Sequence, residues 1–242
     1  MRKNLYSDLY ALEETHWWHR AKRDLCEIYL RKIQKKKRHM RLLDIGCGTG
    51  GNMQSFAKFG KTYGVDISKE AIRFCKQRKL TRVRLGSAHK TRYASSSFDV
   101  ITMLDVLEHV DDKKTLREVR RLLRPGGLLI LTVPAHKMLW SRWDEALHHK
   151  RRYEKKELYN LLASSQFRVL KITHVYSFLF FPVLFIRSLK ARNSKAEYPS
   201  DFSMNNGFLN GILLFVSHIE QSLLRYIHIP FGTSIFCVAE VQ

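Results

Sequence analysis

Short apolar runs and helical patterns alternate along the chain after residue 40. The runs end at glycine or polar residues, which is typical of buried strands, and the segments between them carry apolar positions at helical spacing. The runs expected to form strands are LLDIG, TYGVDIS, VRLGSA, FDVITMLDV, LLILTVPA, FRVLKITHVYS and TSIFCVAEV. Strands that alternate with helices predict an α/β fold with a parallel, doubly wound sheet.

Capping and breaking residues mark the helix boundaries. Ser68 is a suitable N-cap for SKEAIRFCKQRK, and the helix DKKTLREVRRLL is expected to stop at Pro125-Gly126-Gly127. Residues 5–39 have the pattern of a helical segment.

Two apolar blocks lie between the sixth and seventh expected strands, at 178–186 and 208–229. In the second block Ile212, Phe215 and Ile219 share one helical face, whereas polar residues lie off it, which predicts an amphipathic helix. Each block is shorter than the roughly 20 residues that span a bilayer. The pattern leaves open a core or dimer helix, a helix lying in a membrane interface, and a hairpin through the membrane.

These patterns divide the chain into three parts. Residues 1–40 form an N-terminal helical segment, residues 41–177 and 230–242 form the α/β domain, and residues 178–229 form an apolar helical insertion.

Composition narrows the class of protein. The chain has 242 residues, of which 45% are hydrophobic and 27% charged, as expected of a soluble globular protein. Its 4 cysteines include no C-x-x-C pair, so a zinc site or disulfide framework is not expected, and reduced thiols favour a cytosolic protein. The N-terminus has no apolar stretch typical of a secretory signal.

Charge is the outlying property, because 43 Lys and Arg against 22 Asp and Glu give a net +21. Such a field attracts nucleic acid, anionic lipid head groups or phosphorylated substrates. The excess is missing from the apolar last quarter of the chain.

A glycine-rich loop carries the strongest chemical signal. In Asp44-Ile45-Gly46-Cys47-Gly48-Thr49-Gly50-Gly51 a strand ends and a helix begins, and glycines allow a tight turn and close approach of a ligand to the backbone. Gly46-x-Gly48-x-x-Gly51, with Asp66 twenty residues after Gly46, also fits a dinucleotide fingerprint. A nicotinamide-dependent reductase is therefore one alternative.

Four motifs in order resemble those of class I S-adenosylmethionine (SAM)-dependent methyltransferases of the ubiquinone-biosynthesis type. They are Asp44-x-Gly46-x-Gly48-x-Gly50, Tyr63-Gly64-Val65-Asp66-Ile67-Ser68, the segment from Ser97-Phe98-Asp99-Val100 to Leu104-Asp105-Val106-Leu107-Glu108-His109-Val110, and Leu122-Leu123-Arg124-Pro125-Gly126-Gly127. The resemblance covers residues 40–135. It implies a Rossmann-like fold with seven mostly parallel strands, of which the last two are antiparallel, and it implies that residues 1–40 form a lid over SAM.

The resemblance also assigns cofactor contacts. Asp44 would orient the amino group of SAM, Asp66 would accept from both ribose hydroxyls, and Ile67 would pack on adenine. Main-chain contacts are implied at Gly46, Cys47, Gly48, Gly50 and Asp105. The third strand ends in Gly86-Ser87-Ala88, where relatives often have Gly-Asp-Ala, so Ser87 and Ala88 are expected beside adenine without the usual charge. Glu108 and His109 are expected to cap or pack below the site.

Two segments rich in His, Trp and Arg are expected on the acceptor side, at 16–23 and 139–153. Their HWWHRAKR and H-x-RRY patterns resemble a bacterial methyltransferase subgroup linked to cell-surface glycan, lipid-linked or polyprenyl pathways. His149 is the candidate general base, because imidazole titrates near neutrality, and Arg152 is the second catalytic candidate. The residues expected to bind the acceptor are Trp17, His19, Trp140, Arg151 and Tyr153. The alternative is that the RRY segment pairs with Asp144 and caps the next helix, and that the tryptophans pack on the core.

We therefore expect a SAM-dependent methyltransferase that acts without a metal on a small, lipid-linked or glycan-type acceptor, through O-methylation at the cytoplasmic membrane face. Anionic membrane and a homodimer are the expected partners. An RNA methyltransferase is the alternative from charge. Nucleic acid is less favoured because the chain lacks both Asn/Asp-Pro-Pro-Tyr/Phe after the fourth strand and a Pro-Cys dipeptide.

Overall fold

The computed structural model describes residues 3–35, 37, 39–191, 207–224 and 226–242. Part of the predicted insertion, at 192–206 and 225, lies outside the described residues, as do positions 1–2, 36 and 38 of the predicted N-terminal segment.

One sheet of seven strands organises the fold, in the order β3-β2-β1-β4-β5-β7-β6. The strands are β1 (Met40–Ile45), β2 (Gly60–Asp66), β3 (Val83–Leu85), β4 (Phe98–Leu104), β5 (Leu123–Pro134), β6 (Phe167–Val175) and β7 (Ser234–Val241). Only β7 runs against its neighbours, since it pairs antiparallel with both β5 and β6. The mostly parallel seven-stranded sheet is thus confirmed.

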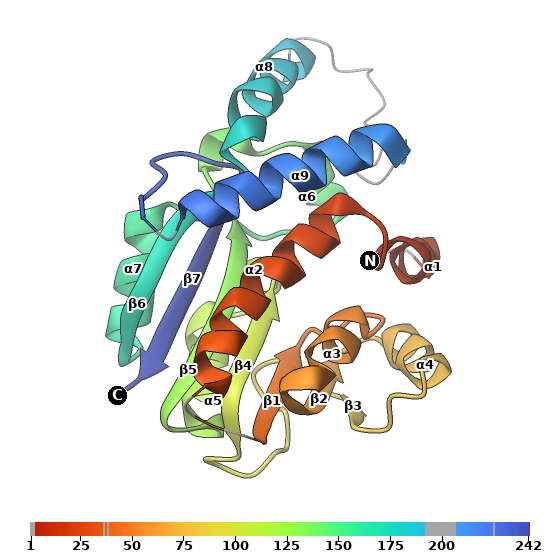
Figure 1. The fold of residues 1–242 in the computed structure, drawn as a ribbon, viewed down its shortest axis with the longest axis vertical. Coiled ribbons are helices and arrows are strands. Elements are labelled where there is room, and N and C mark those ends of the chain that lie inside the picture. Colours follow the sequence, from red (N-terminus) through yellow and green to blue (C-terminus); the bar gives the residue numbers. More distant parts are fainter. Residues whose placement is uncertain (1–2, 36, 38, 192–206, 225) are drawn as a thin grey trace.

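Helices cover both faces of the sheet (Figure 1). They are α1 (Lys3–Leu12), α2 (Trp17–Gln34), α3 (Gly51–Phe56), α4 (Lys69–Gln77), α5 (Asp112–Leu122), α6 (Arg142–Ala146), α7 (Lys155–Ser164), α8 (Phe180–Ala191) and α9 (Gly207–Leu223). One apolar layer joins α2, α3 and α9 to the sheet, and another joins α5 and α7 to its opposite face. Both sheet faces are therefore buried, which explains why the central strands read as continuous apolar runs.

The predicted helix ends are confirmed in one place and shifted in another. Ser68 caps α4, because its side chain accepts from the backbone N–H of Ala71. Helix α5 ends at Leu122, and β5 begins at Leu123, so the chain becomes extended before it reaches Pro125. The residue before a proline is pushed away from the helical region, which favours this earlier end.

The predicted helical segment 5–39 is interrupted. The chain turns after Leu12, and α2 starts at Trp17 with extended His16 as its N-cap, whose Nδ1 accepts from the backbone N–H of Trp18 over 3.3 Å. The break lets α1 leave the line of α2 and pack near α4 (Figure 1).

The insertion leaves the sheet after β6 and returns before β7. Helix α9 lies beside α2 over one face of the sheet, and α8 stands above the carboxyl edge of the strands (Figure 1). Within the described part of the chain, no helix combines the length and apolar character that a bilayer crossing requires.

Candidate functional site

The glycine-rich loop between β1 and α3 needs its glycines for the backbone path. Gly46, Gly48 and Gly50 have φ values of 71°, 54° and 93°, a region that side chains with a Cβ rarely adopt. A Cβ on Gly46 would also lie 2.4 Å from a Val106 methyl carbon. The loop therefore presents main-chain groups at the carboxyl edge of the sheet, where doubly wound folds bind ligands.

Asp44 is buried at the end of β1. Its Oδ1 accepts from the Thr102 hydroxyl over 2.6 Å, and its Oδ2 is buried with no hydrogen-bond partner among the described side chains and backbone. Burial raises the pKa of Asp44 to about 7, although the Thr102 hydrogen bond favours ionisation. An orphaned carboxylate oxygen beside the loop fits a cationic amino group, such as the one in SAM.

Asp66 ends β2 and is tied to the same loop. Its Oδ2 accepts from the Gly48 N–H over 2.9 Å and its Oδ1 from the Ser68 N–H over 2.8 Å. Burial raises the pKa of Asp66, against the effect of these N–H groups. Each carboxylate oxygen can accept a further hydrogen bond, so the carboxylate both shapes the loop and fits a ribose diol.

The remaining residues predicted to bind the cofactor differ in solvent exposure and in the atoms that they can offer to a ligand. Ile67 is 77% exposed, as a platform for a flat ring requires. Ser87 pairs with His89 over 2.9 Å, and Ala88 packs on the core. Cys47 is buried, and contact with Cys75 and burial raise the pKa of its thiol, so Cys47 offers its backbone and not a thiolate.

Helix α1 lies across the glycine-rich loop. The Leu9 side chain comes within 3.3 Å of the place where a Cβ on Gly48 would sit. Buried Glu13 accepts from the Thr49 hydroxyl and from Arg78, whose guanidinium also binds the backbone oxygens of Thr49 and Tyr10. These contacts hold the N-terminal helix over the site.

Asp105 connects the cofactor side to the acceptor side. It follows β4 with a φ of 56°, and its carboxylate binds the Lys22 ammonium and the Thr132 hydroxyl. Burial acts to raise the pKa of Asp105, but the Lys22 charge and these hydrogen bonds hold it below its usual value. Lys22 itself comes from α2, so the N-terminal segment contributes a buried charge to the site.

Next to Asp105 lies a cluster around His149. The His149 Nδ1 is 2.9 Å from the Asp144 Oδ1, and its Nε2 is 3.9 Å from the Glu108 Oε1. The His109 ring packs edge-on against His149, with centroids 4.8 Å apart. Glu108 is fully buried and neither of its oxygens has a hydrogen-bond partner in the described structure. Burial and the Asp105 charge raise its pKa well above the usual range.

The expectation for Glu108 is capping or packing below the site. Its carboxyl group caps no helix, because both oxygens lack partners among the described residues, whereas its full burial agrees with packing. The fold also brings Glu108 and His109 together with His149.

Arg152 pairs with Asp144. Its Nε and Nη2 bind both oxygens of Asp144, over 2.8 and 3.1 Å, and its Nη1 binds the Ala135 carbonyl. A buried guanidinium engaged in this way positions Asp144, which in turn orients His149; a direct catalytic role for Arg152 stays a prediction.

Two predicted acceptor contacts belong to the core. Trp17 is buried against Trp18, Tyr176 and Phe178. Tyr153 is 1% exposed, and its hydroxyl donates to the Leu107 carbonyl. Neither side chain reaches a surface where an acceptor could bind. Their large rings instead stabilise the fold, because they are buried in the core.

The other three candidates vary in exposure. His19 is deeply enclosed, and burial, with the Lys22 charge, lowers its pKa well below the usual value. Arg151 is half-exposed and donates to Asp112 over 2.6 Å. Trp140 is 38% exposed and remains available for an acceptor.

Lys22 and Asp144 are site residues that the sequence pattern did not single out. Lys22 stands three and four positions before Leu25 and Cys26, on the apolar face of the helix, and a lysine on that face is a signal of a buried ion pair. Glu13 and Arg78, which hold α1 down, show no comparable local signal.

Two cavities between the described residues lie away from this site. One, of about 210 Å³, is lined by α2, β6 and α9 residues such as Tyr29 and Lys171. The other, of about 660 Å³, lies near Pro125 and Ser96, at the opposite end of the strands. Neither of these two cavities is lined by the glycine-rich loop or by the buried carboxylates of the site.

The sheet order, the glycine-rich loop and the two carboxylates define a class I SAM-dependent methyltransferase. A SAM-dependent methyltransferase of Thermotoga maritima, described as a possible histamine N-methyltransferase, has the same fold with a TM-score of 0.60 at 16% identity, over 99% of this chain and 96% of that one.

Residues 17–172 match the family described as methyltransferase domain, and the chain belongs to it. An uncharacterised methyltransferase of Schizosaccharomyces pombe is 33% identical over 48% of this chain and 46% of its own length. The ubiquinone biosynthesis O-methyltransferase of Nitrosospira multiformis is 32% identical over 50% of this chain and 59% of its own length. The chain thus spans about half the length of these curated relatives. Because the chain belongs to this family, methyl transfer is favoured over the nicotinamide-dependent reductase that the glycine pattern also allowed.

Proposed function

We propose that this methyltransferase methylates a hydroxyl group of a lipid-linked or glycan-type acceptor while it is bound to the cytoplasmic face of an anionic membrane. The observation that carries the proposal is a row of exposed apolar side chains along the outward side of α9.

The inward side of α9 combines apolar and polar side chains. Leu214 packs in the core beside α2, and the polar side chains bind neighbouring backbone groups. Glu220 accepts from the backbone N–H groups of Tyr176 and Ser177, over 2.6 and 2.7 Å. Gln221 donates to the Ala21 carbonyl, and Asn210 accepts from the Trp17 N–H. An ordinary surface helix buries its apolar residues and exposes its polar ones. Helix α9 buries polar residues together with Leu214 and leaves much of its apolar surface outside.

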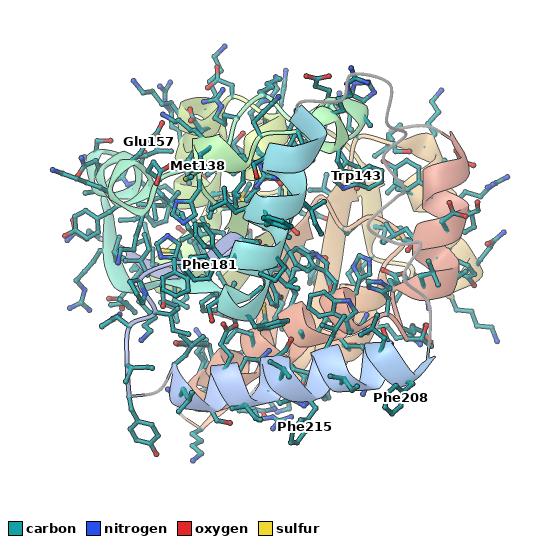
Figure 2. The ribbon with its side chains drawn as sticks, turned by 90° about the horizontal axis from the view of Figure 1, so that it is seen from above. Met138, Trp143, Glu157, Phe181, Phe208 and Phe215 are labelled. Carbon is teal, nitrogen blue, oxygen red and sulfur yellow. The ribbon has the colours of Figure 1, made fainter. Side chains whose placement is uncertain are left out.

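The outward face of α9 is apolar. It exposes Phe208, Ile212, Phe215, Ile219 and Leu223. Figure 2 shows Phe208 and Phe215 pointing away from the body of the protein. Helix α8 adds exposed Phe181, Phe185 and Ile186. Contiguous exposed apolar surface marks an interface, and a chain of net charge +21 is attracted to anionic lipid.

The insertion also reaches the acceptor side of the site. The Arg187 guanidinium on α8 lies 3.7 Å from the carboxylate of Asp144, and the Phe180 ring packs on His136. A lipid surface at α8 would therefore lie near the His149 cluster, which supports an acceptor carried by the membrane.

SAM, when bound, supplies a methyl group on a sulfonium, a leaving group that needs no activation. The protein must align the acceptor and deal with the proton of its hydroxyl group. His149 is built for this second task, because Asp144 fixes its Nδ1–H and leaves Nε2 facing the cluster. Asp105, Asp44 and the glycine-rich loop would hold the cofactor beside it.

The name of the ubiquinone biosynthesis O-methyltransferase supports O-methylation. The direct test is to incubate the purified chain with isotopically labelled SAM and either membrane lipid extract or total RNA, and to identify labelled products by mass spectrometry. We expect a labelled methyl ether in the lipid fraction. Label confined to RNA would overturn the proposal in favour of an RNA methyltransferase, and a labelled amine would overturn O-methylation.

A further inference from the structure

Glu108, His109 and His149 gather three metal-ligating side chains at one point of the site. One ligand atom from each lies within 4.8 Å of the other two. We infer that these residues bind one divalent transition-metal ion, of the zinc, cobalt or ferrous type. The site does not depend on which acceptor is methylated; only its use in the reaction rests on the proposed function.

The hydrogen bonds of the two histidines leave the correct nitrogen atoms for a metal. A carbonyl or carboxylate oxygen only accepts, so the His149 Nδ1 donates to Asp144 over 2.9 Å and the His109 Nδ1 donates to the His148 carbonyl over 3.4 Å. In a neutral imidazole the other ring nitrogen then carries a lone pair. Both Nε2 atoms are therefore in the ligand form.

The Glu108 carboxylate is the third ligand, and it has no hydrogen-bond partner in the described structure. It is fully buried, and within the described structure no donor reaches either of its oxygens. Buried polar groups are nearly always paired. A cation between Glu108 and the two imidazoles would provide the missing partner and would favour the ionised carboxylate.

The surroundings of His149 resemble a second coordination shell. Histidine ligands commonly donate their other N–H to a carboxylate, which fixes the ring. Here Asp144 plays that part, and it is itself held by Arg152 and by the backbone N–H of Ser141 over 2.9 Å. The Asp144 carboxylate is thus oriented by more bonds than a simple helix cap needs.

The three ligand atoms lie within 4.8 Å of one another, so a bound metal would draw them together by up to about 1.4 Å. Bonds of about 2.0–2.1 Å place the ligands of a tetrahedral zinc about 3.3–3.4 Å apart. The His149 Nε2 and the Glu108 Oε1 are 3.9 Å apart, so these two atoms would approach by about 0.5 Å. Two imidazoles and one carboxylate favour zinc, cobalt or iron over magnesium, which prefers oxygen ligands.

A metal here would act on the acceptor hydroxyl. A bound divalent ion lowers the pKa of a coordinated oxygen group, so the hydroxyl would lose its proton more easily. With the ion bound, His149 Nε2 is a ligand and the proton leaves to solvent. Without the ion, Nε2 can accept the proton itself.

The test is a titration of the full chain with Co²⁺ alone, after dialysis against a chelator. Visible absorption reports the geometry around cobalt, and elemental analysis gives the stoichiometry. We expect one equivalent of Co²⁺, displaced by Zn²⁺ and unaffected by a tenfold excess of Mg²⁺. Glu108→Gln and His109→Ala should each weaken Co²⁺ binding at least tenfold, whereas His89→Ala, at an exposed histidine outside the cluster, should bind as the wild type does.

Thermal melting and SAM binding establish that each variant is folded. The inference is overturned if the wild type binds no Co²⁺, or if the folded Glu108→Gln and His109→Ala variants bind it as tightly as the wild type. Because the titration contains neither SAM nor acceptor, its outcome is separate from that of the methylation assay. A chain that forms methyl ethers but binds no Co²⁺ would refute the metal and leave the proposed function standing.

Discussion

The outward apolar face of α9 leads to a quantitative prediction for membrane binding. Phe208 and Phe215 are 79% and 65% exposed. Full burial of a phenylalanine side chain contributes about 1.5–3 kcal/mol, so transfer of these exposed portions into lipid contributes about 2–4 kcal/mol for the pair. The double variant Phe208→Ala and Phe215→Ala should therefore partition onto vesicles about 30-fold to several hundredfold more weakly.

Flotation with vesicles that contain anionic phospholipid measures this partition coefficient. The wild type should float at low salt and less at high salt, because salt screens the attraction of a cationic chain to the lipid head groups. Alanine is a better helix former than phenylalanine, and the polar contacts of α9 with α2 stay in place. Reduced flotation of the double variant would thus report lost lipid contact and not a melted helix, which a thermal melt verifies.

Tyr159→Ala is the matched control, since Tyr159 is a half-exposed aromatic residue on α7, outside the insertion. It should float as the wild type does. The reasoning fails if the double variant floats as well as the wild type. It also fails if the wild type stays in solution with vesicles and elutes as a stable dimer that the double variant cannot form, because the face would then be a protein interface.

Four further outcomes follow from the site. Asp66→Ala should lower SAM affinity, measured by calorimetry, by two charge-assisted hydrogen bonds of about 1.5–3 kcal/mol each; an unchanged affinity in the folded variant would contradict the ribose role. The pKa of about 7 at Asp44 means that the carboxyl group is protonated below that pH, so the affinity of the wild type for cationic SAM should rise from pH 6 to pH 8, and Asp44→Asn should abolish the rise. His149→Ala should reduce turnover roughly 10²–10⁴-fold while SAM affinity stays nearly the same; full activity would remove His149 from the chemistry. Arg78→Ala leaves buried Glu13 without the cationic group bound to it and with the Thr49 hydroxyl still donating, so limited proteolysis should cut the N-terminal segment faster than in the wild type, and equal cutting would show that α1 is held by other contacts.

The sequence by itself determined those parts of the site that are formed by residues close together in the chain. The glycine-rich loop follows directly from its strand, and Asp66 ends the next one, so strand, turn and helix signals within ten residues of each position were enough. Asp144 and Arg152 are eight residues apart, and pairing of the RRY segment with Asp144 was one of the alternatives that the sequence left open. Similarly, the mostly parallel seven-stranded sheet followed from the alternation of elements and from the family resemblance.

Contacts between distant segments were decided only by the tertiary structure. Lys22 meets Asp105 across 83 positions, and α5, β5 and α6 lie between Glu108 and His149 in the sequence, so no pattern in either segment contains the other. The burial of Trp17 was also decided by the tertiary structure. The sequence pattern of a tryptophan beside a predicted site fits a ligand contact and a core residue equally well.

Helix α9 shows this limit most clearly. Its periodicity predicts an apolar face and a polar face, but periodicity carries no information about which face meets the rest of the protein. That choice depends on the partners available across the interface. The N–H groups of Tyr176 and Ser177, just after β6, donate to Glu220, and Gln221 donates to the Ala21 carbonyl on α2. Pairing of buried polar groups, together with Leu214 in the core, decides which side of α9 faces the protein and leaves a row of apolar side chains outside.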